Sequence, residues 1–84
     1  MPRYHFHTQD GSSFTDADGR ELESVRDARI EAARAISQMV EARPDEFWEE
    51  ALFRVTVTDE RGLILFMLDL SAIEAPAMHH PLSQ

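Results

Sequence analysis

The sequence contains no cysteine and no lysine, and it has only three glycines. The absence of cysteine excludes disulfides, thiol catalysis and zinc sites built on thiolates. Gly11, Gly19 and Gly62 each fall in a separate predicted turn, so no glycine-rich loop is available to cradle a phosphate group. No serine lies in a nucleophile motif. The sequence therefore offers no support for an enzyme, and no cofactor is expected.

Positive charge is also scarce. Eight arginines stand against 16 acidic residues, which gives a formal net charge of −8. A surface this negative repels nucleic-acid backbones and anionic lipids, so neither nucleic acid nor membrane is expected as a partner. The longest apolar run, Leu63 to Leu68, is too short to span a bilayer, and no signal peptide is visible. These observations favour a cytoplasmic protein.

The chain has enough apolar residues for one small core, with 84 residues of which 43% are hydrophobic. Alternating patterns predict strands, and spacings of three and four predict one long helix that begins after Ser24 and ends before Pro44. We expect an α+β fold with the architecture of a two-layer sandwich. It has a four-stranded antiparallel sheet with one long helix on one face, in the order strand, strand, helix, short helix, strand, strand. The predicted segments are Arg3 to Thr8, Ser13 to Thr15, Val25 to Arg43, Pro44 to Glu50, Leu52 to Thr58 and Leu63 to Leu68.

We expect residues 1–70 to form a single α+β domain and residues 71–84 to form a partly flexible C-terminal tail. The core should lie between the helix and the inward side chains of the sheet. The predicted sheet residues are Tyr4, Phe6, Phe14, Val55 and Val57, and the predicted helix residues are Val25, Ala32, Ile36 and Met39.

The last predicted strand is apolar on both of its faces, although a single helix covers only one face of a sheet. Its register stays open, because a slip of one residue exchanges the two faces. The outer set is Leu63, Leu65 and Met67 or else Ile64, Phe66 and Leu68. Either the tail, through Ile73, Met78 and Leu82, or a second copy of the chain could cover this set. We favour a homodimer, with an interface formed by His5, His7, Arg54, Leu65, Phe66, Met67 and Leu68.

His5 and His7 flank Phe6 on the first predicted strand and therefore project from the same face. Two imidazoles at this spacing can share a metal ion, for which Asp69, His79 or His80 could supply a third ligand. Together with Arg3 and Arg54, the same pair could instead hold a small anion. The simplest interpretation is a polar strand face. Our leading hypothesis is accordingly a small self-associating binding or regulatory domain that acts through the uncovered sheet face, with a metal- or small-anion-binding protein as the alternative.

A combination of short motifs is distinctive. It consists of R-Y-H-F-H from Arg3, the Asp10-Gly11 turn, D-x-D-G-x-E-L from Asp16, an Ala/Arg-rich helix from Asp27 to Ala35, and V-T-D-E-R-G-L-I-L from Val57. Over about residues 2–70 the chain resembles a family of small bacterial proteins known only as a domain of unknown function. The resemblance implies no activity, cofactor or catalytic residue, but it draws attention to His7 more than to His5.

Overall fold

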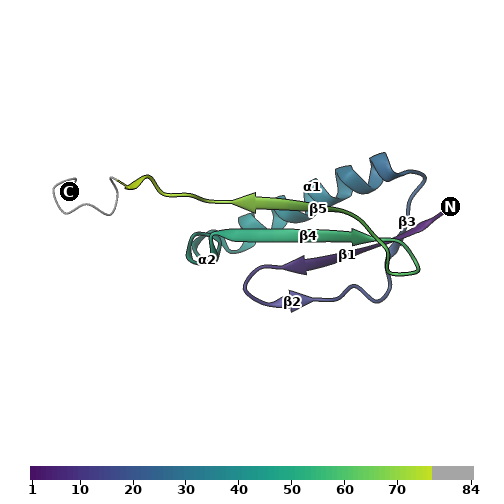
Figure 1. Ribbon diagram of the computed structural model, residues 1–84, viewed down its shortest axis with the longest axis horizontal. Coiled ribbons are helices and arrows are strands. Elements are labelled where there is room, and N and C mark those ends of the chain that lie inside the picture. Colours follow the sequence, from purple (N-terminus) through teal and green to yellow (C-terminus); the bar gives the residue numbers. More distant parts are fainter. Residues whose placement is uncertain (77–84) are drawn as a thin grey trace.

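A computed structural model describes residues 1–76 of the chain. The elements are β1 (Arg3–Gln9), β2 (Ser13–Phe14), β3 (Arg20–Glu21), α1 (Val25–Ala42), α2 (Pro44–Glu50), β4 (Leu52–Thr58) and β5 (Ile64–Ser71) (Figure 1). The α+β class and the predicted order of the main elements are confirmed. Within residues 1–76, no helix has the length and apolar character needed to cross a membrane.

The sheet is antiparallel and has the order β2-β1-β4-β5. β3, which the sequence did not predict, pairs with the first residues of β1. The two short strands β2 and β3 therefore lie along the same side of β1, and β5 forms the opposite edge of the sheet (Figure 1).

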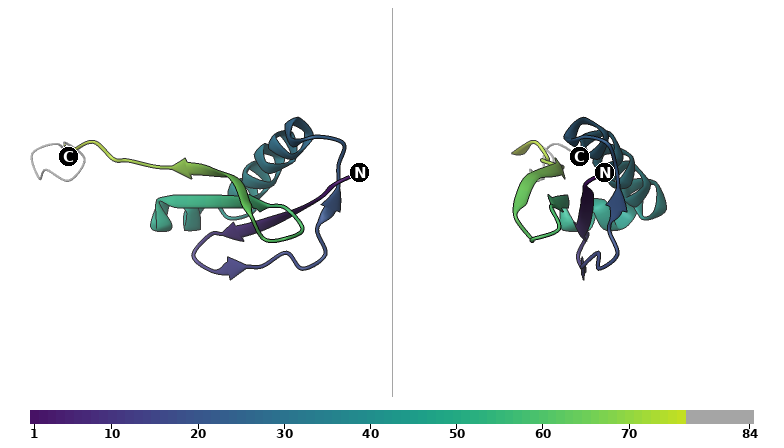
Figure 2. Two further views of the ribbon diagram at one scale, coloured as in Figure 1. Left: turned by 45° about the vertical axis from the view of Figure 1, so that its right-hand side comes forward. Right: turned by 90° about the vertical axis from the view of Figure 1, so that its right-hand side faces the viewer.

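Helix α1 begins and ends where local signals predict. The hydroxyl of Ser24 accepts a hydrogen bond from the amide of Asp27, which satisfies one of the free N–H groups of the first turn. The helix ends before Pro44, and this proline starts α2. Helix α1 packs against one face of the sheet, mainly over β4 (Figure 2).

The core joins one stripe of α1 to the inward side chains of β1 and β4, and Phe47 of α2 closes one end. Phe47 and Phe53 meet edge to face, with their ring centroids 5.1 Å apart. The buried apolar residues are Tyr4, Ala28, Ala32, Ile36, Phe47, Phe53, Val55 and Val57.

Two predicted core residues lie elsewhere. Phe14 is 60% exposed, because β2 has only two residues and lies at the edge of the sheet beyond β1. Val25 is 38% exposed, because it occupies the first position of α1, ahead of the buried stripe that starts at Ala28. The prediction of Phe14 and Val25 as core residues was wrong.

Candidate functional site

The face of the sheet opposite α1, here called the open face, carries both histidines. In an antiparallel sheet, directly paired residues project from the same side. His7 pairs with Thr56, which pairs with Met67, and Arg54 pairs with Asp69. The side chains that share this face therefore include His5, His7, Arg54, Thr56, Thr58, Ile64, Met67 and Asp69.

The register of the last strand, which the sequence left open, is fixed by an irregularity between Val57 and Thr58. Val57 pairs with Phe66, whereas Thr58 pairs with Ile64, so Leu65 is an extra residue in β5. Phe66 and Leu68 consequently pack against the core beneath α1. Among the residues predicted for the interface, Met67 lies on the open face with Arg54, His5 and His7, whereas Phe66 and Leu68 face the helix. Leu65 is exposed at the irregularity, where the pairing assigns it to neither face.

The two imidazole rings stack almost parallel, with centroids 6.2 Å apart and an angle of 7° between their planes. The amide N–H of Asp16 donates to Nδ1 of His7 at 3.1 Å, so this nitrogen is unprotonated. The proton of neutral His7 is therefore on Nε2, which lies 3.2 Å from the hydroxyl of Thr58. Nδ1 of His5 lies 2.9 Å from the carbonyl oxygen of Asp16 and donates to it.

Asp16 is thus held by both histidines, and its carboxylate holds two further backbone groups. One oxygen accepts from the amide of Phe6 at 3.0 Å, and the other accepts from the amide of Gly19 at 3.1 Å. Burial opposes the charged form of this carboxyl, but the hydrogen bonds from Phe6 and Gly19 outweigh burial and the pKa of Asp16 is lowered. The histidines and Asp16 together fasten the segment after β2 to β1.

This arrangement engages most of the groups that a metal ion or anion would use. Both ring nitrogens of His7 are hydrogen-bonded, and Asp69 forms a two-pronged ion pair with Arg54 at 2.7 and 2.9 Å. The hydrogen bond from Arg54 lowers the pKa of Asp69. Arg3 is bonded to Glu21 and to the carbonyl of Asp18.

Residues 1–76 contain no group of three or more His, Cys, Asp or Glu side chains placed to hold a metal ion. The candidate third ligands His79 and His80 lie outside the described residues. Met78 and Leu82, through which the tail could cover the last strand, also lie outside them. Ile73, the third such tail residue, is described and is 90% exposed.

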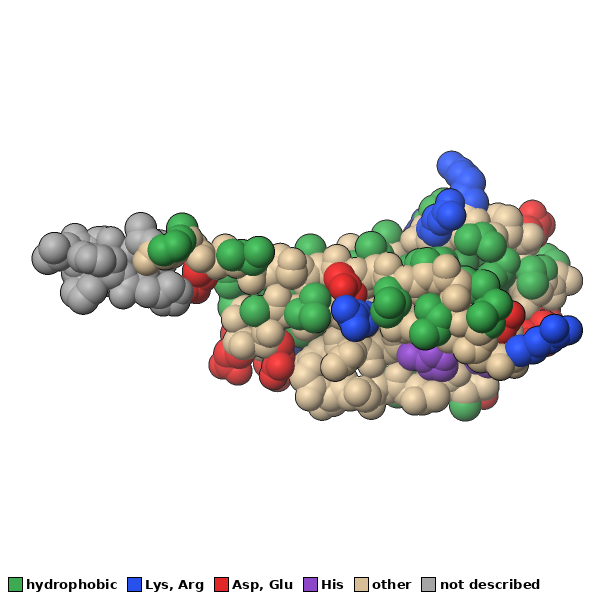
Figure 3. Space-filling view, viewed as in Figure 1, with side chains coloured by type: hydrophobic (Ala, Val, Ile, Leu, Met, Phe, Trp, Pro, Cys, Tyr) green, Lys and Arg blue, Asp and Glu red, His purple; other side chains and the backbone are tan. Residues whose placement is uncertain are grey.

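The most apolar part of the open side is β5 with the turn before it. Leu63, Ile64 and Met67 are 63%, 55% and 53% exposed, and Leu65 is also exposed. Figure 3 shows hydrophobic side chains gathered beside the histidines. The ion pair of Arg54 and Asp69 lies on the same face. A surface of this kind, apolar with a few paired polar groups, is typical of a protein interface.

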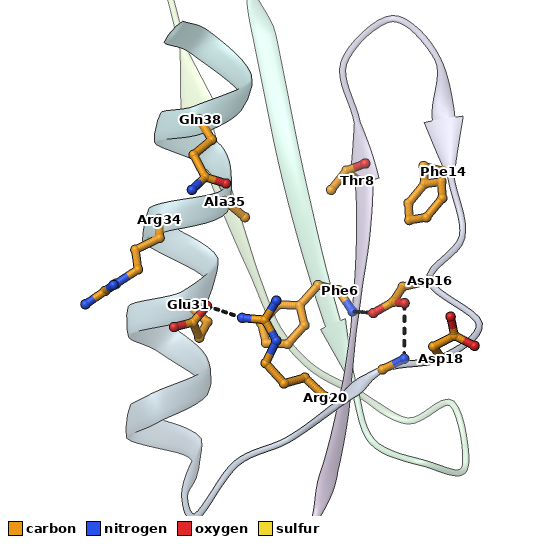
Figure 4. A pocket seen from close by; sticks show the side chains of 11 residues that line it. Phe6, Thr8, Phe14, Asp16, Asp18, Arg20, Glu31, Arg34, Ala35 and Gln38 are labelled. Carbon is orange, nitrogen blue, oxygen red and sulfur yellow. Dashed lines mark hydrogen bonds and ion pairs between the residues drawn. The ribbon is translucent and has the colours of Figure 1, made fainter. Parts of the chain in front are cut away.

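A separate cavity of about 680 Å³ lies on the other side of the sheet, between α1 and the β1–β2 segment (Figure 4). Phe6 and Thr8 of β1 line it together with Phe14. The exposed side chain of Phe14 therefore forms part of the wall of this cavity. Arg20 and Glu31 form an ion pair across it, and both oxygens of Asp16 are already hydrogen-bonded. The sequence did not predict this cavity, because its walls come from segments far apart along the chain.

Residues 3–71 match the sequence pattern of a protein family described as "Domain of unknown function (DUF6894)". The chain belongs to this family, which confirms the resemblance found in the short motifs. Comparison with curated proteins and with solved structures gives no significant match.

Proposed function

We propose that this domain of unknown function is a self-associating binding module, and that two copies of the chain associate through β5, where this apolar surface lies. The observation that carries the proposal is the exposure of Leu63, Ile64 and Met67 around one strand of a very small domain. Burying a large apolar side chain contributes about 1.5–3 kcal/mol. The whole domain is expected to have only about 4–8 kcal/mol of stability, so covering this surface is a large gain.

Charge also supports this surface as the place where two copies meet. The chain carries a formal net charge of −8, so two copies repel each other over most of their surfaces. Within β5, Asp69 is the only charged residue, and Arg54 neutralises it through their ion pair. The approach of two copies therefore costs least at β5.

The alternative, a metal ion or small anion bound by His5 and His7, has no such support. Both ring nitrogens of His7 are hydrogen-bonded, and Arg54 is paired with Asp69. The two histidines are better explained as residues that hold the loop at Asp16 and border the interface.

The test is the oligomeric state of Met67→Asp compared with Ile30→Asp, measured by sedimentation equilibrium. Both residues are exposed and apolar, but Ile30 lies on α1. We expect the wild type and Ile30→Asp to be dimers at micromolar concentration and Met67→Asp to be a monomer. A monomeric wild type, or a dimer that Met67→Asp leaves intact, contradicts the proposal. Phe66→Asp is unsuitable because Phe66 packs against the core.

A further inference from the structure

The outer edge of β5 is a row of backbone groups without a partner strand. β5 is the last strand in the sheet order, and over residues 1–76 it pairs only with β4. It is also the longest strand, with eight residues from Ile64 to Ser71. An exposed edge of this length is a template for pairing with another strand.

The hydrogen bonding at the end of β5 fixes which of its residues point outward. The amide of Ala72 donates to the carbonyl of Ala51 at 2.9 Å, which extends the ladder between β4 and β5. In an antiparallel ladder, residues at even spacing from Ala72 direct their N–H and C=O groups to β4, and the residues between direct theirs away. Phe66, Leu68 and Leu70 therefore bond inward. The residues whose backbone groups point outward are Met67, Asp69 and Ser71, because the alternation stops at the extra residue Leu65.

The opposite edge of the sheet is closed, which makes β5 different. β2 and β3 pair with the two ends of β1, and the carboxylate of Asp16 accepts from the amide of Phe6 between them. Over residues 1–76, β5 has no comparable cover, and apart from the irregularity at Leu65 it has few of the devices that usually protect an edge. It contains no proline and no lysine, and its one charged residue is neutralised by Arg54.

We propose, resting on the self-association proposed above, that two copies join by antiparallel pairing of their β5 strands about a two-fold axis at Leu68, so that one continuous sheet crosses the dimer. With this axis, Met67 of one copy lies opposite Asp69 of the other, and this pair occurs twice in the dimer. The outward backbone groups of Met67 and Asp69 thus hydrogen-bond to each other across the axis. An axis at Asp69 is disfavoured, because it places two carboxylates directly opposite each other.

Amide hydrogen exchange on the wild-type protein tests this pairing residue by residue. Amides of Phe66, Leu68 and Leu70 should be protected at every concentration, because β4 already bonds them. Amides of Met67 and Asp69 should gain protection as the protein concentration rises from micromolar to millimolar. A dimer in which these two amides exchange equally fast at all concentrations overturns edge pairing.

A pair of variants separates edge pairing from association through side chains. Met67→Pro removes the outward N–H, whereas Met67→Ala removes the side chain and keeps the N–H. We expect Met67→Pro to weaken dimerisation by about a hundredfold or more, because each dimer loses the donor twice, and Met67→Ala to weaken it by about tenfold or less. Circular dichroism checks that both variants fold. If Met67→Pro does not fold, hydrogen exchange on the wild type decides whether the β5 strands pair.

The outcomes distinguish the two proposals. If both variants lose the dimer equally, or if both keep it, edge pairing is overturned while self-association stands. A monomeric wild type overturns both.

Discussion

Asp16→Asn removes one charge without changing the shape of the side chain, and it tests whether Asp16 holds the loop to β1. In the wild type its two carboxylate oxygens accept from the amides of Phe6 and Gly19. An asparagine offers only one oxygen, so one of these amides then faces an NH₂ group. A hydrogen bond to a charged acceptor that is lost in this way costs about 1–3 kcal/mol. We expect Asp16→Asn to lower the free energy of unfolding by this amount, which is roughly 4–8 °C in Tm for each kcal/mol.

The stability difference should also depend on pH, because the pKa of Asp16 is lowered in the folded state. A carboxyl with a lowered pKa stabilises the fold fully above its unfolded value, which is near 3.8, and this contribution is lost as the pH falls through the folded pKa. The wild type should therefore lose its advantage over Asp16→Asn in acid, below the ordinary pKa. Above that pH the carboxyl of Asp16 stays charged, so its contribution to the stability difference between the wild type and Asp16→Asn should be constant.

Urea unfolding followed by circular dichroism between pH 2 and pH 7 measures this difference. Asp18→Asn is the matched control, since it makes the same charge change two residues away. In the described structure the side chain of Asp18 accepts no hydrogen bond, and only its backbone carbonyl accepts one, from Arg3. Equal stability losses in the two variants, or a loss in Asp16→Asn that persists unchanged in acid, would refute the reasoning.

Two further predictions concern backbone geometry and capping, and thermal unfolding checks both. Gly19→Ala should lower the free energy of unfolding by about 2–4 kcal/mol, and Gly62→Ala should lower it by about 1 kcal/mol. Both glycines have a positive φ, which strains any other residue. An added Cβ at Gly19 also comes within 2.9 Å of the Tyr4 carbonyl oxygen, whereas nothing lies within 4 Å at Gly62. Similar losses at both positions would show that the close approach at Gly19 is unimportant. Ser24→Ala should cost about 1 kcal/mol because it removes the N-cap of α1. Ser37→Ala, in the middle of the same helix, should be neutral or stabilising, and a Ser24→Ala variant as stable as Ser37→Ala contradicts the capping role.

Local chemistry explains why so much of the fold could be predicted from the sequence. Ser24 caps α1 and Pro44 ends it, and both act through backbone groups only a few residues away. The turn before β5 is likewise made by Asp59, whose side chain accepts from the amides of Arg61 and Leu63. Interactions of this kind leave a pattern in a short stretch of sequence.

The candidate site was harder to predict because it depends on contacts between distant segments. Period-two alternation correctly placed His5 and His7 on the open face, but it could not show that Asp16 bonds one ring nitrogen of each. The sequence alone therefore left a metal ion at this pair as an alternative. In the same way Phe14 looked like a core residue, although the tertiary structure leaves it exposed beside the cavity.

The sequence by itself determined the elements, their order and the excess of apolar residues in β5, because periodicity, capping and proline act locally. Only the tertiary structure decided which of those apolar residues face outward. The extra residue at Leu65 shifts the register, so that Phe66 and Leu68 pack on the core while Ile64 and Met67 lie on the open face. The reason is that a strand's register is set by burial against residues far away in the chain, and a slip of one residue exchanges its two faces.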